Sequence, residues 1–224
     1  MSIPGAPAPT RDNPRDHAAL MDSIYRGQRH IYDATRKYFL FGRDRLIGEL
    51  DCQPHHAVLE VGCGTGRNLH RIGQRWPGVS LHGLDISREM LASASARLGA
   101  SARLAQGDAT GFDPAPLFGR ENFDRVVLSF SLSMIPAWQA ALEQAMRVLA
   151  PGGALHVVDF GDAAGLPAPL RAGLRAWLAH FHVSPRLDLA ETAGTLAAGK
   201  GYLAHGQRGP LGYYQLIRIL NPER

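Results

Sequence analysis

A short apolar run, Val58 to Val61, leads directly into three glycines at alternate positions, and this junction constrains the fold more than any other part of the chain. The glycines are Gly62, Gly64 and Gly66. Glycine lacks a Cβ atom and tolerates positive φ, so such a loop can turn sharply and bring bare backbone N–H groups against a ligand. A dinucleotide-binding loop would need another glycine at position 67, which is Arg67. The pattern predicts a buried strand followed by a ligand-binding loop without the pyrophosphate fingerprint.

A second apolar run, Val79 to Leu84, ends on Asp85. The spacing from the glycine loop suits one loop, helix and strand. Because the carboxyl ends of neighbouring parallel strands lie side by side, the Asp85 carboxylate should face the glycine loop, where it can accept hydrogen bonds from ribose hydroxyls. A helix N-cap or a solvated turn is the alternative for this residue.

Further segments follow in an order that resembles the motifs of the class I S-adenosylmethionine-dependent methyltransferases. They are Glu60 to Gly66, Val79 to Asp85, Gln106 to Ala109, Phe123 to Ser131, and Leu149 to Gly153 followed by Ala154 to Asp159. The resemblance implies a Rossmann-like, doubly wound α/β sheet of seven strands, with S-adenosyl-L-methionine as cofactor. The cofactor-binding residues that it implies are Glu60, Gly62, Gly64, Gly66, Asn68, Asp85, Ile86, Met90, Asp108, Ala109 and Ser129.

The length of 224 residues and the hydrophobic content of 45% suit one domain with a sizeable core. We expect residues 1–50 to form a disordered tail and an N-terminal helical cap, and residues 51–224 to form the methyltransferase core. Helices are predicted at 67–74, 88–98, 137–148, 166–181 and 188–198, and two closing strands at 202–206 and 212–220. The two cysteines, Cys52 and Cys63, suggest no disulfide framework. With no signal-peptide pattern in Met1 to Thr10, a cytoplasmic protein is expected.

Two segments combine aromatic or aliphatic residues with arginines. The first, if helical through Gly27 and Gly42, would align Tyr25, Arg29, Tyr32, Arg36, Phe39 and Arg43. The second would place Leu170, Leu174, Trp177, Leu178 and Phe181 on one helix face and Arg171, Arg175, His182 and Arg186 on the adjoining face. These patterns predict peripheral association with an anionic membrane, at the inner face of the cytoplasmic membrane, and ordinary core packing is the alternative.

The N-terminal region and three later segments resemble a narrower group, the bacterial betaine-lipid N-methyltransferases. The matching segments are Tyr32 to Arg36, Phe39 to Asp44, Glu60 to Asn68, Ser131 to Pro136 and Gly212 to Tyr214. This resemblance implies conversion of diacylglyceryl homoserine to its trimethyl form in three steps. The alternatives are a phosphatidylethanolamine N-methyltransferase, a small-molecule methyltransferase and a cofactor-binding regulator.

An amine acceptor indicates an aromatic pocket, because aromatic faces tolerate a quaternary ammonium through cation–π attraction. The predicted acceptor-pocket residues are Tyr25, Tyr32 and Tyr214, with Tyr38, Phe130 and Tyr213 as further candidates. Arg43 is predicted to pair with a carboxylate of the cofactor or of the acceptor. The segment Ser129 to Ser133 stands where magnesium-dependent relatives have carboxylates and where nucleic-acid amino methyltransferases have an Asp or Asn before two prolines. We therefore expect no metal and no nucleic-acid partner, and no pattern indicates an oligomeric state.

Overall fold

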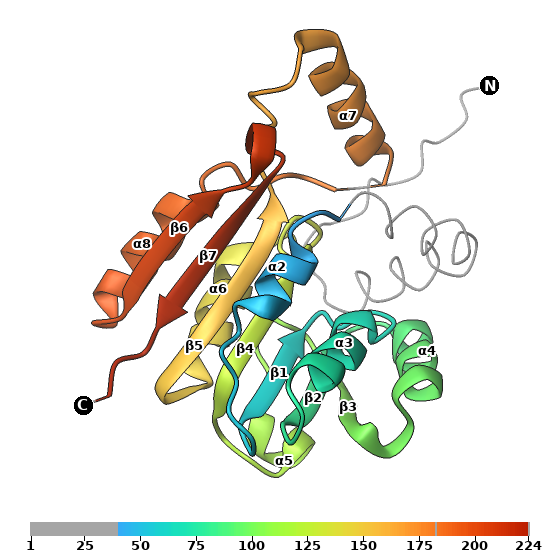
Figure 1. Cartoon of the computed structure of the whole chain (residues 1–224), viewed down its shortest axis with the longest axis vertical. Coiled ribbons are helices and arrows are strands. Elements are labelled where there is room, and N and C mark those ends of the chain that lie inside the picture. Colours follow the sequence, from blue (N-terminus) through green and yellow to red (C-terminus); the bar gives the residue numbers. More distant parts are fainter. Residues whose placement is uncertain (1–39, 182, 224) are drawn as a thin grey trace, which may run out of the picture.

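The computed structural model describes residues 40–181 and 183–223. A seven-stranded sheet has the strand order β3-β2-β1-β4-β5-β7-β6 (Figure 1). The strands are β1 (Ala57–Val61), β2 (Ser80–Asp85), β3 (Ala102–Gln106), β4 (Phe123–Ser129), β5 (Leu149–Phe160), β6 (Leu203–Arg208) and β7 (Tyr214–Leu220). The first five strands pair in parallel, and β7 enters antiparallel between β5 and β6. The predicted doubly wound α/β fold is confirmed.

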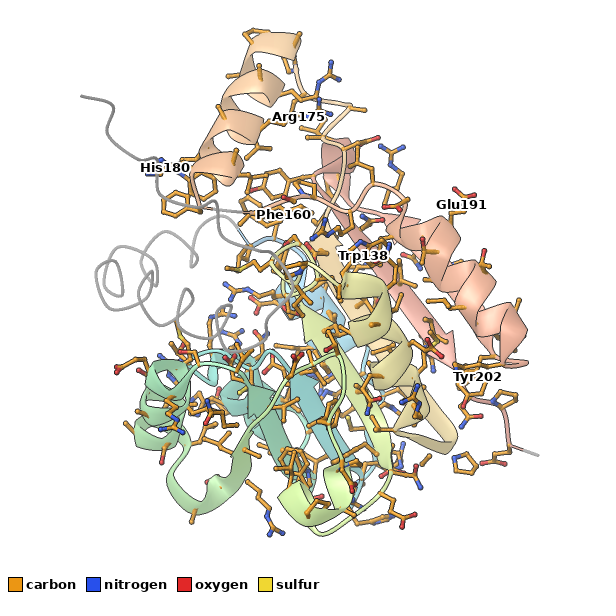
Figure 2. The ribbon with its side chains drawn as sticks, turned by 180° about the vertical axis from the view of Figure 1, so that it is seen from behind. Trp138, Phe160, Arg175, His180, Glu191 and Tyr202 are labelled. Carbon is orange, nitrogen blue, oxygen red and sulfur yellow. The ribbon has the colours of Figure 1, made fainter. Side chains whose placement is uncertain are left out.

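Helices cover both faces of the sheet. The helices are α2 (Arg43–Gly48), α3 (Arg67–Arg75), α4 (Arg88–Leu98), α5 (Pro114–Phe118), α6 (Trp138–Arg147), α7 (Ala168–His180) and α8 (Leu189–Gly199). Figure 1 shows α2, α3 and α4 on the near face, and the view from behind shows α6, which begins at Trp138, and α8 on the other (Figure 2). Helix α7 stands beyond the sheet, at the edge where β5 ends (Figure 1). Among the helices of the described ranges, none combines the length and the hydropathy of a membrane-spanning segment.

Each face of the sheet has its own apolar core. Leu46, Leu69 and Ile72 belong to the core beneath α2 and α3, whereas Leu142 and Met146 of α6 belong to the core on the opposite face. All five residues of β1 are buried, because a parallel strand covered on both faces loses the alternation of apolar and polar residues. The same burial explains why the central strands could be recognised as continuous apolar runs.

Several boundaries differ from the sequence-based prediction. Helix α5 was not predicted, although Asp113 accepts a hydrogen bond from the backbone N–H of Ala115 and Pro114 occupies its first turn, a common helix start. Strand β5 begins at Leu149 rather than Ala154, since Leu149 already pairs with Phe123.

The N-terminal stripe is interrupted at Gly42. This residue has φ 91° and precedes the first residue of α2, so a helix cannot run unbroken through it to Arg43. The other stripe residues, including Tyr25 and Tyr32, lie outside the described residues, as do Tyr38 and the predicted tail. Of the predicted tail and cap, residues 40–50 are described, and they contain α2.

Candidate cofactor and acceptor site

Two adjoining cavities lie at the carboxyl ends of β1, β2 and β4. The smaller has a volume of about 90 Å³ and extends toward β3, and the larger has about 320 Å³ and extends toward α2 and α3. Both are lined by Gly62, Gly64 and Ser129, so they form one continuous site. The carboxyl edge is where open parallel sheets bind ligands.

The glycine loop forms the wall between the cavities. Gly62, Gly64 and Gly66 all have positive φ, at 75°, 53° and 73°. A Cβ atom on Gly66 would lie 2.8 Å from a methyl group of Leu98, because α4 packs closely against the start of α3. A Cβ atom on Gly64 would meet nothing within 4 Å, since this residue faces the cavity. Gly66 is therefore required by helix packing, and Gly64 leaves room for a ligand.

Asp85 joins the end of β2 to the glycine loop. Its Oδ2 accepts a hydrogen bond of 2.7 Å from the N–H of Gly64, and its Oδ1 accepts one of 2.9 Å from the N–H of Ser87. A carboxylate has about four acceptor positions, so it can accept from ligand hydroxyls as well as from backbone N–H groups. Ile86 lines the same cavity, while Met90 is buried behind it. The bond from Ser87 is the contact expected of a turn residue, so the alternative interpretation of Asp85 is partly correct.

Glu60 is buried at the floor of the larger cavity. Its Oε1 accepts a hydrogen bond of 2.7 Å from Nδ2 of Asn68, and its Oε2 accepts no hydrogen bond of good geometry from the described residues. Burial raises the pKa of Glu60 to about 8, while Asn68, the charge of Arg43 and the backbone N–H of Leu69 act in the opposite direction. A buried carboxylate oxygen without a hydrogen bond of good geometry is costly. It suits a ligand that carries a cationic amino group.

The smaller cavity has polar groups that suit a nucleoside. Asp108 and Ala109 line it, and Oδ1 of Asp108 accepts hydrogen bonds from the N–H and the hydroxyl of Thr110. The hydroxyls of Ser129 and Ser131 are buried and have no partner within the described part of the chain. Apolar walls come from Phe130, Met134 and Ile135 among others. We infer that a flat ligand with several polar atoms fits here.

Of the described residues that were predicted to contact the acceptor, Arg43 and Phe130 line the cavities, whereas Tyr213 and Tyr214 do not. Arg43 is buried and lines the larger cavity, and Phe130 lines the smaller one with φ 53°, a strained conformation that is typical of functional sites. The Tyr214 ring packs tightly against Gly42 and Gly209 and lies outside the lining of both cavities. Tyr213 packs edge-on against Phe41 and Phe160, and burial raises its pKa to about 12. Aromatic acceptor contacts by Tyr213 and Tyr214 stay predictions.

The basic wall of the larger cavity was predicted only at Arg43. The other basic residues that line this cavity are Arg67, His70, Arg71 and Arg97. Arg67, His70 and Arg71 come from consecutive turns of α3, so their spacing of three and four residues could have indicated a shared face. Arg97 comes from α4 and donates to the carbonyl oxygen of Thr65 at 2.6 Å, a contact that local spacing does not reveal.

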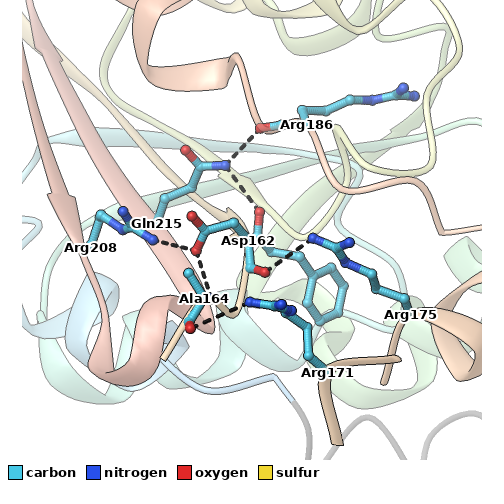
Figure 3. A network of polar contacts seen from close by, with 8 residues as sticks. Asp162, Ala164, Arg171, Arg175, Arg186, Arg208 and Gln215 are labelled. Atoms are coloured by element: carbon cyan, nitrogen blue, oxygen red, sulfur yellow. Dashed lines mark hydrogen bonds and ion pairs between the residues drawn. The ribbon is translucent and has the colours of Figure 1, made fainter. Parts of the chain in front are cut away.

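Arg186 holds the loop that lines the smaller cavity. Its guanidinium donates to the carbonyl oxygens of Leu132 at 3.1 Å and Ile135 at 2.9 Å. Figure 3 shows the hydrogen bond of 2.8 Å that the carbonyl of Arg186 accepts from Gln215. The prediction that Arg186 lies on the basic face of the Trp177 helix is wrong, because α7 ends at His180 and Arg186 turns back toward the sheet. Nearby, the buried Asp159 accepts from the N–H of Ser133 at 3.0 Å, and burial raises its pKa to about 6.

Replacing Arg186 with methionine should weaken cofactor binding by about fivefold to tenfold, because two charged hydrogen bonds to the cavity loop are lost. Calorimetric titration measures this. Arg103→Met is the matched control, since Arg103 also donates to a backbone carbonyl, that of Phe118, away from the cavities. Equal cofactor affinity of the two variants would show that Arg186 does not position the loop.

Together the sheet order, the glycine loop and the carboxylate at the end of β2 define an α/β protein that binds a nucleoside-containing ligand at its carboxyl edge. Comparison with known proteins narrows this class. Residues 58–153 match the family described as methyltransferase domain. The chain is 30% identical over 177 residues to the ubiquinone/menaquinone biosynthesis C-methyltransferase of Syntrophotalea carbinolica, covering 76% of this chain and 70% of that protein. The chain belongs to the class I S-adenosylmethionine-dependent methyltransferases.

Other relatives agree at the level of family or fold. The chain is 32% identical over 153 residues to the demethylmenaquinone methyltransferase of Beutenbergia cavernae, which covers 66% of this chain but only 59% of that protein. The fold is similar to that of the plantazolicin methyltransferase BpumL, with a TM-score of 0.70 at 14% identity over 94% of this chain and 97% of that chain. It also resembles phosphoethanolamine N-methyltransferase 2 of Haemonchus contortus, with a TM-score of 0.65 at 14% identity over 81% and 52%.

The cavity fits the cofactor of this family. Asp85 can hold the ribose hydroxyls, Asp108 and Ala109 border the place of the adenine, and the Oε2 atom of Glu60 suits the amino group of the methionine end. These roles are proposals for the individual residues. No group of three or more His, Cys, Asp or Glu side chains in the described ranges is arranged to hold a metal ion.

Proposed function

We propose that the protein transfers methyl groups from S-adenosylmethionine to the amino group of a membrane lipid, with diacylglyceryl homoserine as the acceptor and a trimethyl betaine lipid as the product. The observation that supports this proposal most directly is the basic wall of the larger cavity. The sequence resemblance to betaine-lipid N-methyltransferases supports it independently. We propose that the enzyme works at the surface of the membrane that contains this lipid.

The charges beside the larger cavity suit an acceptor that carries an anionic group. Arg43, Arg67, Arg71 and Arg97 line it, whereas the nearby carboxylates are Glu60 in the lining and Asp44, which lies 3.6 Å from both Arg67 and Arg71. Within the described residues, this cavity therefore combines four guanidinium groups with the carboxyl groups of Glu60 and Asp44. The carboxylate of the methionine end can occupy one arginine, and a second anion, the homoserine carboxylate, can occupy another.

Positioning supplies most of the rate in such a reaction. Bound S-adenosylmethionine supplies a sulfonium-linked methyl group for in-line displacement by a neutral amine. Phe130 and Met134 contribute apolar walls beside Ser129, which both cavities share, and the basic wall disfavours a protonated amine beside it, which lowers the pKa of the acceptor amine. We infer that the chain promotes the transfer by orienting and partly desolvating the amine.

A second candidate is methylation of a lipid quinol at carbon. It is favoured by the names of the relatives, which are 30% to 33% identical and are demethylmenaquinone or ubiquinone/menaquinone methyltransferases. A neutral quinol ring does not need several arginines, so the basic wall favours the zwitterionic lipid. Both candidates share an acceptor that resides in a membrane.

The test is to incubate the protein with labelled S-adenosylmethionine and vesicles that contain diacylglyceryl homoserine, phosphatidylethanolamine or demethylmenaquinol, and to resolve the lipids by mass. Stepwise addition of methyl groups to the homoserine lipid alone is expected. Labelling only of phosphatidylethanolamine would move the assignment to a phosphodiester head group, and labelling only of the quinol would replace N-methylation by C-methylation. Cofactor binding without any labelled lipid would direct the search to soluble amines.

A further inference from the structure

Three arginines gather where β5 ends, beyond the cavities. Arg171 and Arg175 lie on successive turns of α7, and Arg208 ends β6. The guanidinium of Arg208 pairs with the carboxylate of Asp162, Arg175 donates to the Asp162 carbonyl at 3.5 Å, and Arg171 donates to the Ala164 carbonyl at 3.5 Å (Figure 3). These contacts supply one carboxylate for three guanidinium groups.

The sequence around α7 contains no acidic residue that would offset this positive charge. Between Asp162 and Asp188 there is no acidic residue, although Arg171, Arg175 and Arg186 fall in that stretch. The side chain of Arg208 is 63% exposed even in its ion pair. An exposed pair of this kind is weak, so Asp162 does little to keep Arg208 from another anion.

Two exposed leucines border the arginines. Leu170 on α7 is 61% exposed and Leu211 in the turn between β6 and β7 is 57% exposed. The carbonyl of Leu211 accepts a hydrogen bond of 3.0 Å from the N–H of Gly165, so this turn lies beside the same short segment that Arg171 contacts. Leu211 also has φ 54°, which is costly for a side chain of this size. Neither leucine is used to build the apolar core.

The arginines and leucines lie at the same edge of the sheet as the cofactor site. Strand β6 ends at Arg208, β7 begins at Tyr214 and β5 ends at Phe160, opposite Tyr214. Strands β1, β2 and β4 end in the cavities at this edge. Figure 1 shows α7 projecting from it, and Figure 2 labels Arg175 on that helix.

We propose that Leu170, Arg171, Arg175, Arg208 and Leu211 form a docking face for an anionic lipid bilayer, which orients the cavities toward the membrane. The proposal rests on the proposed lipid acceptor and names the surface through which the enzyme reaches it. Arginines bind the anionic head groups, and the leucines insert at the boundary of the acyl chains. Each arginine near an anionic surface strengthens binding by about fivefold.

The test is flotation of the full chain with vesicles of phosphatidylcholine, with and without phosphatidylglycerol. Arg171→Gln/Arg175→Gln should bind the anionic vesicles about 25-fold more weakly than the unchanged protein. The matched control, Arg120→Gln/Arg147→Gln, removes the same charge from the opposite edge, just before β4 and β5, and should bind as the unchanged protein does. Leu211→Gly should also weaken binding while relieving the strained backbone.

Failure of the docking face and failure of the proposed function give different results. Absence of binding to anionic vesicles, or equal loss of binding in both double variants, would overturn the docking face. Arginine-dependent binding without methylation of any lipid would support the docking face and overturn the acceptor. Full activity of Arg171→Gln/Arg175→Gln on a water-soluble short-chain homoserine lipid, with activity lost on vesicles, would support both.

Discussion

Replacing Asp85 with alanine should weaken binding of S-adenosylmethionine by about 1 to 3 kcal/mol, roughly fivefold to 150-fold. Two losses combine in this variant. The ribose hydroxyls lose a charged acceptor, and the N–H of Gly64 loses the 2.7 Å hydrogen bond that fixes the glycine loop. Calorimetric titration with the cofactor measures the effect.

The control for this variant is Asp113→Ala. Asp113 accepts from the N–H of Ala115 at 3.1 Å, much as Asp85 accepts from Ser87, but it caps α5 away from both cavities. Both variants lose a local backbone hydrogen bond, and only Asp85→Ala should lose cofactor affinity. An unchanged dissociation constant in Asp85→Ala would remove the ribose assignment.

Replacing Glu60 with glutamine should stabilise the empty protein at alkaline pH and weaken cofactor binding. Burial raises the pKa of Glu60 from 4.5 to about 8. Between these values the folded chain retains a proton that the unfolded chain releases, so the free energy of unfolding falls as the pH rises through this range. Glutamine does not ionise and still accepts from Asn68 through its carbonyl oxygen.

Urea unfolding at about pH 5 and about pH 8 tests the first half of this prediction, and the variant should gain on the order of 3 kcal/mol at the higher pH and little at the lower. Glu143→Gln is the control, because Glu143 lies at the surface beside Lys200. For binding, we expect at least a tenfold loss in Glu60→Gln, because Glu60 can release its proton to pair with the cationic amino group and glutamine cannot ionise. Equal pH dependence in the variant and the unchanged protein would contradict the buried ionisation.

The central sheet could be predicted because its strands carry two independent signals, continuous apolar runs and chemistry at their carboxyl ends. Val58 to Val61 and Phe123 to Ser129 are buried strands that end at a glycine loop and at Ser129. Seven of the eleven predicted cofactor residues line the smaller cavity or its shared wall for this reason: Gly62, Gly64, Asp85, Ile86, Asp108, Ala109 and Ser129. Glu60 and Asn68 line the larger cavity.

The remaining parts of the site depend on contacts between distant segments. Arg186 reaches the carbonyl of Leu132 across 54 positions of sequence, and no local pattern encodes that distance. Helical periodicity placed Leu170 on an apolar face, and the structure leaves Leu170 exposed because α7 stands beyond the sheet. The periodicity of a helix does not indicate whether another element covers its apolar face. Gly66 was predicted as a ligand contact from its motif, whereas a Cβ atom at this position would meet Leu98 and Ala94.

The segment that carries Arg186 follows α7, and Arg186 also contacts the loop that lines the smaller cavity, which has a thermodynamic consequence. If binding of a bilayer at α7 changes the affinity for the cofactor by some factor, binding of the cofactor must change the affinity for the bilayer by the same factor. If a bilayer moves α7 and thereby strengthens the hydrogen bonds of Arg186 to Leu132 and Ile135, occupancy of the cofactor cavity raises the affinity for the bilayer by the same factor that the bilayer raises the affinity for the cofactor. The enzyme would then bind the lipid surface more weakly when its cofactor cavity is empty.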